Sequence, residues 1–400
     1  MTDAFSRARQ HFLDGVSQFE AGCHAQAEAH FEAALALMPG RVSTLVNLAA
    51  TRLQLGRHEA ALPLLDEALA SAPGDADAWR HRGTALNALA RHDEALACHE
   101  RVLALTPHDA QAWLRHGQAL QYLERHDPAL ASYERALSLD AGLAQAWTNR
   151  ANILKHRGRV DEAAAAFRQA MALGGDEALN GYYLAALTGQ AAPDTPPRAY
   201  VERLFDDYAE TFDAHLLGAL GYRAHRLLLE PLQAQPGDTR FRCALDLGCG
   251  TGLCAPLIKA VAERVDGVDL SAAMLAKARA LGLYERLEQA DLVAHLAQTE
   301  LRHDLVVAAD VFIYVGALAP VFSGVHRVLL PGGSFCFSAE QAAGEADFEL
   351  LPSLRYAHSE RYLRAMAAQA GFAIERLVAQ PIREEQRRPI AGLYATLRKT

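Results

Sequence analysis

The stretch Asp246-Leu247-Gly248-Cys249-Gly250-Thr251-Gly252 decides how the second half of the chain is interpreted. It follows the apolar run 243–247, which predicts a buried β-strand. Three glycines at alternate positions let the backbone turn tightly and let a ligand approach the main chain without a Cβ clash. The stretch therefore predicts a ligand site at the end of a strand.

Short apolar runs alternate with helix-length segments on the C-terminal side of this loop. This alternation is typical of βαβ units, a parallel sheet and ligands at the carboxyl ends of the strands. We therefore expect an α/β fold, Rossmann-like, with a mostly parallel seven-stranded sheet. The expected strands are 243–247, 264–269, 287–290, 304–310 and 333–338, with a closing pair at 371–378 and 391–398.

The spacing of the glycines separates two kinds of nucleotide-type site. Dinucleotide sites favour G-x-G-x-x-G, in which pyrophosphate rests on a helix N-terminus. Here the sixth position is Leu253, and Asp246 precedes the first glycine by two residues. A carboxylate in this place repels pyrophosphate and suits a cationic ligand.

Acidic residues also follow the next three expected strands. Asp269 lies 19 residues after Gly250, where a carboxylate can accept hydrogen bonds from a ribose diol. Asp291 ends the third strand and Asp310 the fourth. The turn 331–333, Pro-Gly-Gly, precedes the fifth.

Together these features resemble the class I S-adenosylmethionine-dependent methyltransferases over about 200 residues. The resemblance implies S-adenosyl-L-methionine as methyl donor and S-adenosyl-L-homocysteine as product. It places the transferred methyl near Asp310 and Tyr314, which are the candidate catalytic residues. The candidate cofactor-binding residues are Asp246, Gly248, Cys249, Gly250, Thr251, Gly252, Asp269, Leu270, Met274, Asp291, Leu292, Asp310 and Tyr208.

The acceptor stays open at this point, between a small molecule and a protein side chain. The segment 310–314 lacks the Asn/Asp-Pro-Pro-Tyr motif of many amide- and adenine-methylating enzymes, and no metal-ligand cluster is evident. The alternatives are a cofactor-binding scaffold without catalysis and an NAD-type oxidoreductase. Further candidates for the site are Tyr222, His326, His358 and Arg383.

The first half of the chain repeats with a period of 34 residues. Trp79, Trp113 and Trp147 share one phase, with a small residue four positions later and an alanine sixteen positions later. His11 and Leu45 extend the phase towards the N-terminus. Five such copies occupy about residues 8–177, which predicts stacked helical hairpins.

The pattern resembles the tetratricopeptide repeat, which asks for an aromatic residue four positions after the mid-repeat alanine. Phe31, Tyr133 and Phe167 fill that slot, while Leu65 and His99 depart from it. The resemblance implies an all-α solenoid with a groove for a protein or peptide partner. Candidate groove residues are Asn87, Gln111, Gln118, Gln121, Asn152 and Lys155.

These features divide the chain into two domains. Residues 1–190 are predicted to hold the repeats and a capping helix over 176–190. The segment 191–197 has three prolines and predicts a stiff linker. Residues 198–400 are predicted to form the methyltransferase domain, in which the helical segment 198–240 acts as a lid.

Composition sets the remaining expectations. The chain has 400 residues, a formal net charge of −9 and 22% charged residues, which argues against general nucleic-acid binding. No apolar run is long enough for a membrane span, and the N-terminus lacks the layout of a secretory signal. Six scattered cysteines read as reduced thiols, so we expect a cytoplasmic protein.

Overall fold

The computed structural model describes residues 2–190, 192–233, 241–385 and 387–400. Contacts divide the chain into two compact units, Met1–Asp176 and Glu177–Thr400. Each unit is described below by itself.

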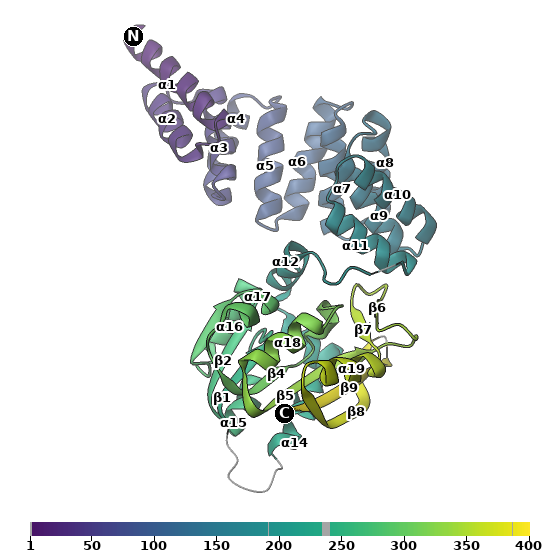
Figure 1. The fold of residues 1–400 in the computed structure, drawn as a ribbon. Coiled ribbons are helices and arrows are strands. Elements are labelled where there is room, and N and C mark those ends of the chain that lie inside the picture. Colours follow the sequence, from purple (N-terminus) through teal and green to yellow (C-terminus); the bar gives the residue numbers. More distant parts are fainter. Residues whose placement is uncertain (1, 191, 234–240, 386) are drawn as a thin grey trace. The chain divides into compact units, whose positions relative to one another are not determined.

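The first unit is a stack of helix pairs, as the 34-residue period predicts (Figure 1). The two helices of each pair pack against each other, and the second helix of a pair packs against the first helix of the next pair in the stack. The helices are α1 (Thr2–Glu20), α2 (His24–Leu37), α3 (Val42–Gln54), α4 (His58–Ser71), α5 (Ala76–Ala88), α6 (His92–Leu105), α7 (Ala110–Tyr122), α8 (His126–Leu139), α9 (Ala144–His156) and α10 (Val160–Ala172).

Small residues at fixed phase bring the two helices of a pair together. A Cβ on Gly117 would lie 2.6 Å from the ring of Tyr133, and one on Gly83 would lie 2.6 Å from the ring of His99. His99 therefore occupies the same place as the aromatic residue of the other repeats, although its side chain departs from the pattern.

The phased tryptophans share one contact. The indole N–H of Trp79 donates to the carbonyl oxygen of Pro73 at 2.9 Å, and Trp147 donates to Ala141 at 3.0 Å. Because the acceptor is a backbone carbonyl six residues earlier, the contact survives where alanine replaces the proline of the pattern.

The second unit is an α/β fold with nine strands in one sheet, where we predicted seven. The additional strands β6 and β7 form a short hairpin that the sequence pattern did not indicate. The strands are β1 (Phe241–Leu247), β2 (Ala262–Asp269), β3 (Arg286–Gln289), β4 (His303–Ala308), β5 (Leu329–Gln341), β6 (Phe348–Leu350), β7 (Tyr356–His358), β8 (Phe372–Glu385) and β9 (Arg388–Lys399).

The sheet is mostly parallel. Strands β3, β2, β1, β4 and β5 run parallel in that order. Next to β5 lies β9, which is antiparallel to it, and β8 pairs antiparallel with β9 and so runs in the direction of β5. Glu340 at the end of β5 pairs with Gly392 of β9 and with Ala357 of β7. Since a strand has two edges, β7 lies on the β4 side of β5, beyond the end of β4.

Helices cover both faces of this sheet (Figure 1). Buried apolar residues of α14 and α15 pack with one face, and those of α17, α18 and α19 pack with the other. The helices are α11 (Glu177–Thr188), α12 (Arg198–Tyr208), α13 (Phe212–Ala214), the π-helical turn η1 (His215–Ala219), α14 (Ala224–Gln233), α15 (Ala255–Val261), α16 (Ala272–Ala280), α17 (Leu292–Gln298), the 3₁₀ turn η2 (Phe312–Tyr314), α18 (Ala319–Val328) and α19 (Glu360–Gln369).

The boundary between the units differs from the predicted linker. The contacts place α11 in the second unit, where the hydroxyl of Tyr182 donates to the carbonyl oxygen of Leu354 at 2.6 Å. The role of α11 as the cap of the repeats stays a prediction. Residue 191 of the predicted linker and residues 234–240 of the predicted lid lie outside the described residues.

Candidate functional site

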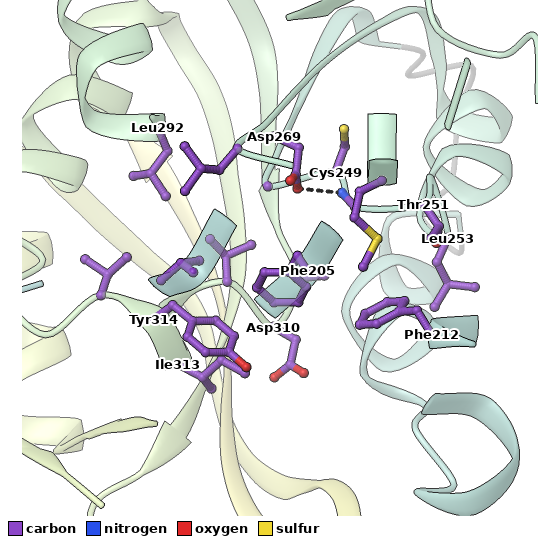
Figure 2. A pocket seen from close by; sticks show the side chains of 18 of the residues that line it. Phe205, Phe212, Cys249, Thr251, Leu253, Asp269, Leu292, Asp310, Ile313 and Tyr314 are labelled. Carbon is purple, nitrogen blue, oxygen red and sulfur yellow. Dashed lines mark hydrogen bonds between the residues drawn. The ribbon is translucent and has the colours of Figure 1, made fainter. Parts of the chain in front are cut away.

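The glycine loop follows β1 and turns back beside β2. Gly248, Gly250 and Gly252 all have positive φ, at 72°, 53° and 89°. The backbone N–H of Gly250 donates to Oδ2 of Asp269 at 2.8 Å (Figure 2). A Cβ on Gly250 would meet nothing within 4 Å, so space is open beside the loop where a ligand can approach the main chain.

Two of the predicted acids flank this loop. Asp269 also accepts from the backbone N–H of Ser271 at 2.9 Å, and burial raises the pKa of its carboxyl group. Asp246 is buried and accepts from the hydroxyl of Tyr284 at 2.7 Å. Burial raises the pKa of Asp246 to about 7, against the opposing effect of the Tyr284 hydrogen bond.

The other two acids are fixed by local structure. Oδ1 of Asp291 caps α17 by accepting from the backbone N–H groups of Val293 and Ala294, each at 3.0 Å. Asp310 has a positive φ of 59°, and its backbone N–H donates to Oγ of Ser338 at 2.9 Å. Burial raises the pKa of Asp310, an effect that nearby Arg383 opposes.

Two acidic residues of the segment from α12 to α13 accept hydrogen bonds from the predicted cofactor-binding stretches. Asp206 accepts from Oγ of Ser271 at 2.5 Å, and Asp213 accepts from Oγ1 of Thr251 at 2.6 Å. The predicted helical lid 198–240 is interrupted, because α12 ends at Tyr208 and no helix covers residues 220–223 before α14 begins.

These elements enclose a cavity of about 360 Å³ at the carboxyl ends of the strands. Every predicted cofactor residue except Gly252 lines it, and so do Tyr314, Tyr222 and Arg383. Figure 2 shows Asp310 and Tyr314 on one side of Phe205 and Asp269 on the other. The structure thus brings the predicted site residues together, while the role of each stays a prediction.

Two candidate histidines do not line the cavity. His326 lies on α18 with its ring against Phe372, at a centroid distance of 5.4 Å. His358 ends β7 rather than starting a helix, and its Nε2 lies 3.0 Å from the carbonyl oxygen of Gly316. Burial lowers the pKa of His358 to about 4, which is the behaviour of a packed neutral ring.

The sequence analysis named Arg383 but missed the charged residues that surround it beside Asp310. Arg383 contacts Asp310, Glu340 and Glu385, and Arg355 contacts Glu385. Arg355 also lines the cavity. Glu340 ends β5 and could have been found as a fifth strand-end acid, but no motif marked Arg355 or Glu385.

Among the described residues one group of side chains has metal-ligand chemistry, namely Cys243, Asp266 and His303. Nε2 of His303 and Sγ of Cys243 lie 3.2 and 3.6 Å from Oδ2 of Asp266. None of the three lines the cavity, so the group forms a separate hydrogen-bonded network.

Comparison with known families agrees with both units. The methyltransferase domain family matches residues 245–337, which includes the glycine loop, the whole of β2, β3 and β4, and parts of β1 and β5. Tetratricopeptide repeat families match residues 18–83, 52–119 and 114–178. The chain carries tetratricopeptide repeats and a methyltransferase domain.

The curated proteins that match the methyltransferase domain are named as methyltransferases or as methyltransferase-like proteins. Human methyltransferase-like protein 27 is 32% identical over 169 residues, which are 40% of this chain and 66% of that protein. Malonyl-[acyl-carrier protein] O-methyltransferase of Pseudescherichia vulneris is 28% identical over 34% of this chain and 52% of its own length. Trans-aconitate 2-methyltransferase of Paracidovorax citrulli is 32% identical over 37% of this chain and 51% of its own length. The chain thus spans between about half and 66% of the length of these relatives.

The predicted groove residues of the repeats are partly engaged within the array. Oε1 of Gln121 accepts from the hydroxyl of Tyr133 at 2.8 Å, and the amide of Asn87 lies 3.3 Å from His99. Burial lowers the pKa of Lys155 to about 8.

In the part of the chain that the structure describes, no helix is long and apolar enough to cross a membrane.

Proposed function

We propose that the chain is a class I methyltransferase that uses S-adenosyl-L-methionine. The observation that carries the proposal is the convergence of the loop 248–251 with Asp246, Asp269, Asp291 and Asp310 on one cavity. The family match over 245–337 supports it.

The residues present fit this cofactor. Open space beside Gly250 gives a ligand access to the main chain, and Asp269 presents a carboxylate next to it for a ribose diol. Asp246, with its raised pKa, gains its charge most readily beside a cation. A pyrophosphate would meet these acids instead, which disfavours the NAD-type alternative.

The bound cofactor would supply a methyl group on a positively charged sulfur. The acceptor's lone pair would form the new bond to the methyl carbon as the carbon–sulfur bond breaks, and the sulfur would leave as a neutral thioether. The main task of the protein is alignment, because the leaving group is a good one. We assign this alignment to Asp310 and Tyr314, and any proton on the acceptor leaves to a base or to water.

The repeats are proposed to bind a protein or peptide partner, and the acceptor to be a small molecule or a protein side chain. Names among the relatives state O-methylation of malonyl-[acyl-carrier protein] and methylation of trans-aconitate. These names describe those proteins, and they support both kinds of acceptor, one bound to a carrier protein and one a small molecule.

Calorimetric titration of the full chain tests the proposal. We expect S-adenosylmethionine and S-adenosylhomocysteine to bind in the micromolar range, about −8 kcal/mol, and NAD to show no heat of binding. A folded, ligand-free sample that binds neither methionine-derived ligand would falsify the proposal. Binding without transfer to any acceptor would favour the scaffold alternative.

A further inference from the structure

The charged residues that line the cavity differ in sign from place to place. The acids Asp246, Asp269 and Asp291 lie near the ends of β1, β2 and β3, on the side assigned to the cofactor. Arg355 and Arg383 line the cavity with Asp310, the acid after β4. Two of the three lining arginines, Arg355 and Arg383, therefore lie where the acceptor must enter, whereas the third, Arg198, comes from α12.

Each side-chain nitrogen of Arg383 contacts a carboxylate of a neighbouring residue. Its side chain is 2% exposed, and its nitrogens contact Asp310, Glu340 and Glu385. Nε lies 2.9 Å from Oε1 of Glu385. A guanidinium with carboxylates on each of its nitrogens orients those carboxylates and has little to offer a ligand.

Arg355 is placed differently. Its side chain is 24% exposed, it lines the cavity, and its charge opposes the rise that burial causes in the pKa of Tyr314. Its carboxylate partner is Oε1 of Glu385, the same oxygen that Arg383 contacts. One carboxylate oxygen shared by two guanidinium groups compensates only part of the charge of Arg355.

The backbone around this group of charges is strained. Among the described residues of the second unit, the non-glycine residues with positive φ are Asp310, Leu354 and Arg387, at 59°, 64° and 62°. Asp310 belongs to the charged group, Leu354 precedes Arg355, and Arg387 lies two residues after Glu385. Such strain costs of order 1–3 kcal/mol per residue, persists only where the surroundings enforce it, and concentrates at functional sites.

The surroundings of Arg355 do enforce its position. The hydroxyl of Tyr182 donates to the carbonyl oxygen of Leu354 at 2.6 Å. The backbone N–H of Leu351 donates to the carbonyl oxygen of Arg355 at 2.8 Å, which closes the loop between β6 and β7. The backbone at Arg355 is thus fixed by contacts that do not involve the guanidinium group.

We propose that the methyl acceptor carries a carboxylate and that Arg355 binds it. The inference rests on the proposed function. A planar guanidinium fork matches the two oxygens of a carboxylate in geometry and charge. An amine acceptor would find Asp310 and Glu385 already paired with guanidinium groups. Among the described residues, Arg355 contacts a carboxylate through one nitrogen, which leaves its other N–H groups for a ligand.

Titration of the full chain saturated with S-adenosylhomocysteine tests the inference. The probes are succinate, citrate, benzoate and glutamate, each compared with its amide, together with inorganic phosphate and propylamine. We expect at least one acid to bind tenfold or more tightly than its amide, phosphate and propylamine. Arg355→Met should abolish that preference, and Arg355→Lys should retain part of it.

The matched control is Arg361→Met on α19, whose exposed side chain pairs with Asp347 outside the cavity. The affinity for S-adenosylhomocysteine should stay within twofold in all three variants, which shows that they fold. Absence of any preference for acids over amides, stronger binding of phosphate or propylamine, or an unchanged preference in Arg355→Met would overturn the inference. Failure of the proposed function is recognised separately, because S-adenosylhomocysteine would then not bind to the unmodified chain.

Discussion

One guanidinium nitrogen of Arg383 donates to both carboxylate oxygens of Asp310, at 3.3 and 3.4 Å. A second nitrogen of Arg383 contacts Glu340, whose side chain is 4% exposed. Removal of one partner from a buried ion pair leaves a charge without compensation and is strongly destabilising. Arg383 therefore fixes two acids at strand ends. The sequence analysis identified Asp310 but not Glu340.

Arg383→Met should destabilise the second unit by about 3–5 kcal/mol at pH 7. Burial already raises the pKa values of Asp310 and Glu340, and loss of the guanidinium raises them further. Since both carboxyl groups can then be protonated, the deficit should shrink as the pH falls towards 5. Hydrogen exchange of peptides from β5 and β8 measures the effect within this unit.

Arg398→Met on β9 is the control for this variant. Its side chain is 40% exposed and pairs with Glu375, so a change of at most about 1 kcal/mol is expected. Equal protection of β5 and β8 in Arg383→Met and in the unmodified chain would contradict the stabilising role of Arg383.

The raised pKa of Asp246 predicts a pH-dependent affinity for the cofactor product. In the free protein this pKa is about 7, well above the usual value of 3.8. The ammonium group of this ligand, placed beside Asp246, favours the carboxylate and lowers the pKa in the complex. Affinity should therefore rise with pH up to about 7 and then level off, with a gain of up to about 2 kcal/mol between pH 5.5 and 7.5.

Calorimetry with S-adenosylhomocysteine at pH 5.5, 6.5 and 7.5 measures this dependence. Asp246→Asn removes the titrating group while keeping the side chain's size, so its affinity should vary little over the same range. If the variant shows the same rise as the unmodified chain, the proton belongs to another group.

Local features predicted the half of the site that lies on consecutive strand ends. The glycine loop and the acids at 246, 269, 291 and 310 could be found because each acid follows an apolar run, and the sheet then places them along one edge. Gly252 could not be excluded from the cavity by spacing alone. Its α-carbon faces Leu281 and Tyr284 instead.

The acceptor side could not be predicted in the same way. Arg355, Glu340 and Glu385 come from a loop and two strands that are far apart in the sequence, and Arg355 is placed by the β6–β7 hairpin. That hairpin has three-residue strands, too short for an alternating pattern to show. Long-range pairing, rather than local propensity, assembles this part of the site.

Asp269→Ala should weaken binding of S-adenosylhomocysteine by about 1.5–3 kcal/mol, the scale for a charged hydrogen-bond partner. The structure adds a second reason for the loss, because Asp269 also holds the N–H groups of Gly250 and Ser271. Asp269→Asn keeps one acceptor oxygen and should therefore lose less. Glu263→Gln, at an exposed position of the same strand, serves as the control. Unchanged affinity in Asp269→Ala would show that the ribose contact is assigned to the wrong residue.

The last prediction concerns the repeats, where His99 fills an aromatic slot against Gly83. Burial lowers the pKa of His99 to about 4, below the usual 6.5. Between these values the unfolded chain binds a proton that the folded array does not, so stability falls as the pH drops from 6.5 to 4, by up to about 3 kcal/mol. His99→Phe should remove most of this loss, because phenylalanine fits the slot without titrating.

Tryptophan fluorescence during urea unfolding measures the repeats selectively, since the three tryptophans of the chain are Trp79, Trp113 and Trp147. The comparison is between pH 7 and pH 4.5, and His108→Phe, at an exposed position, is the control. His99→Phe should unfold at nearly the same urea concentration at both pH values, whereas the control should behave like the unmodified chain. An equal shift in all three proteins would show that another group causes the acid sensitivity of the array.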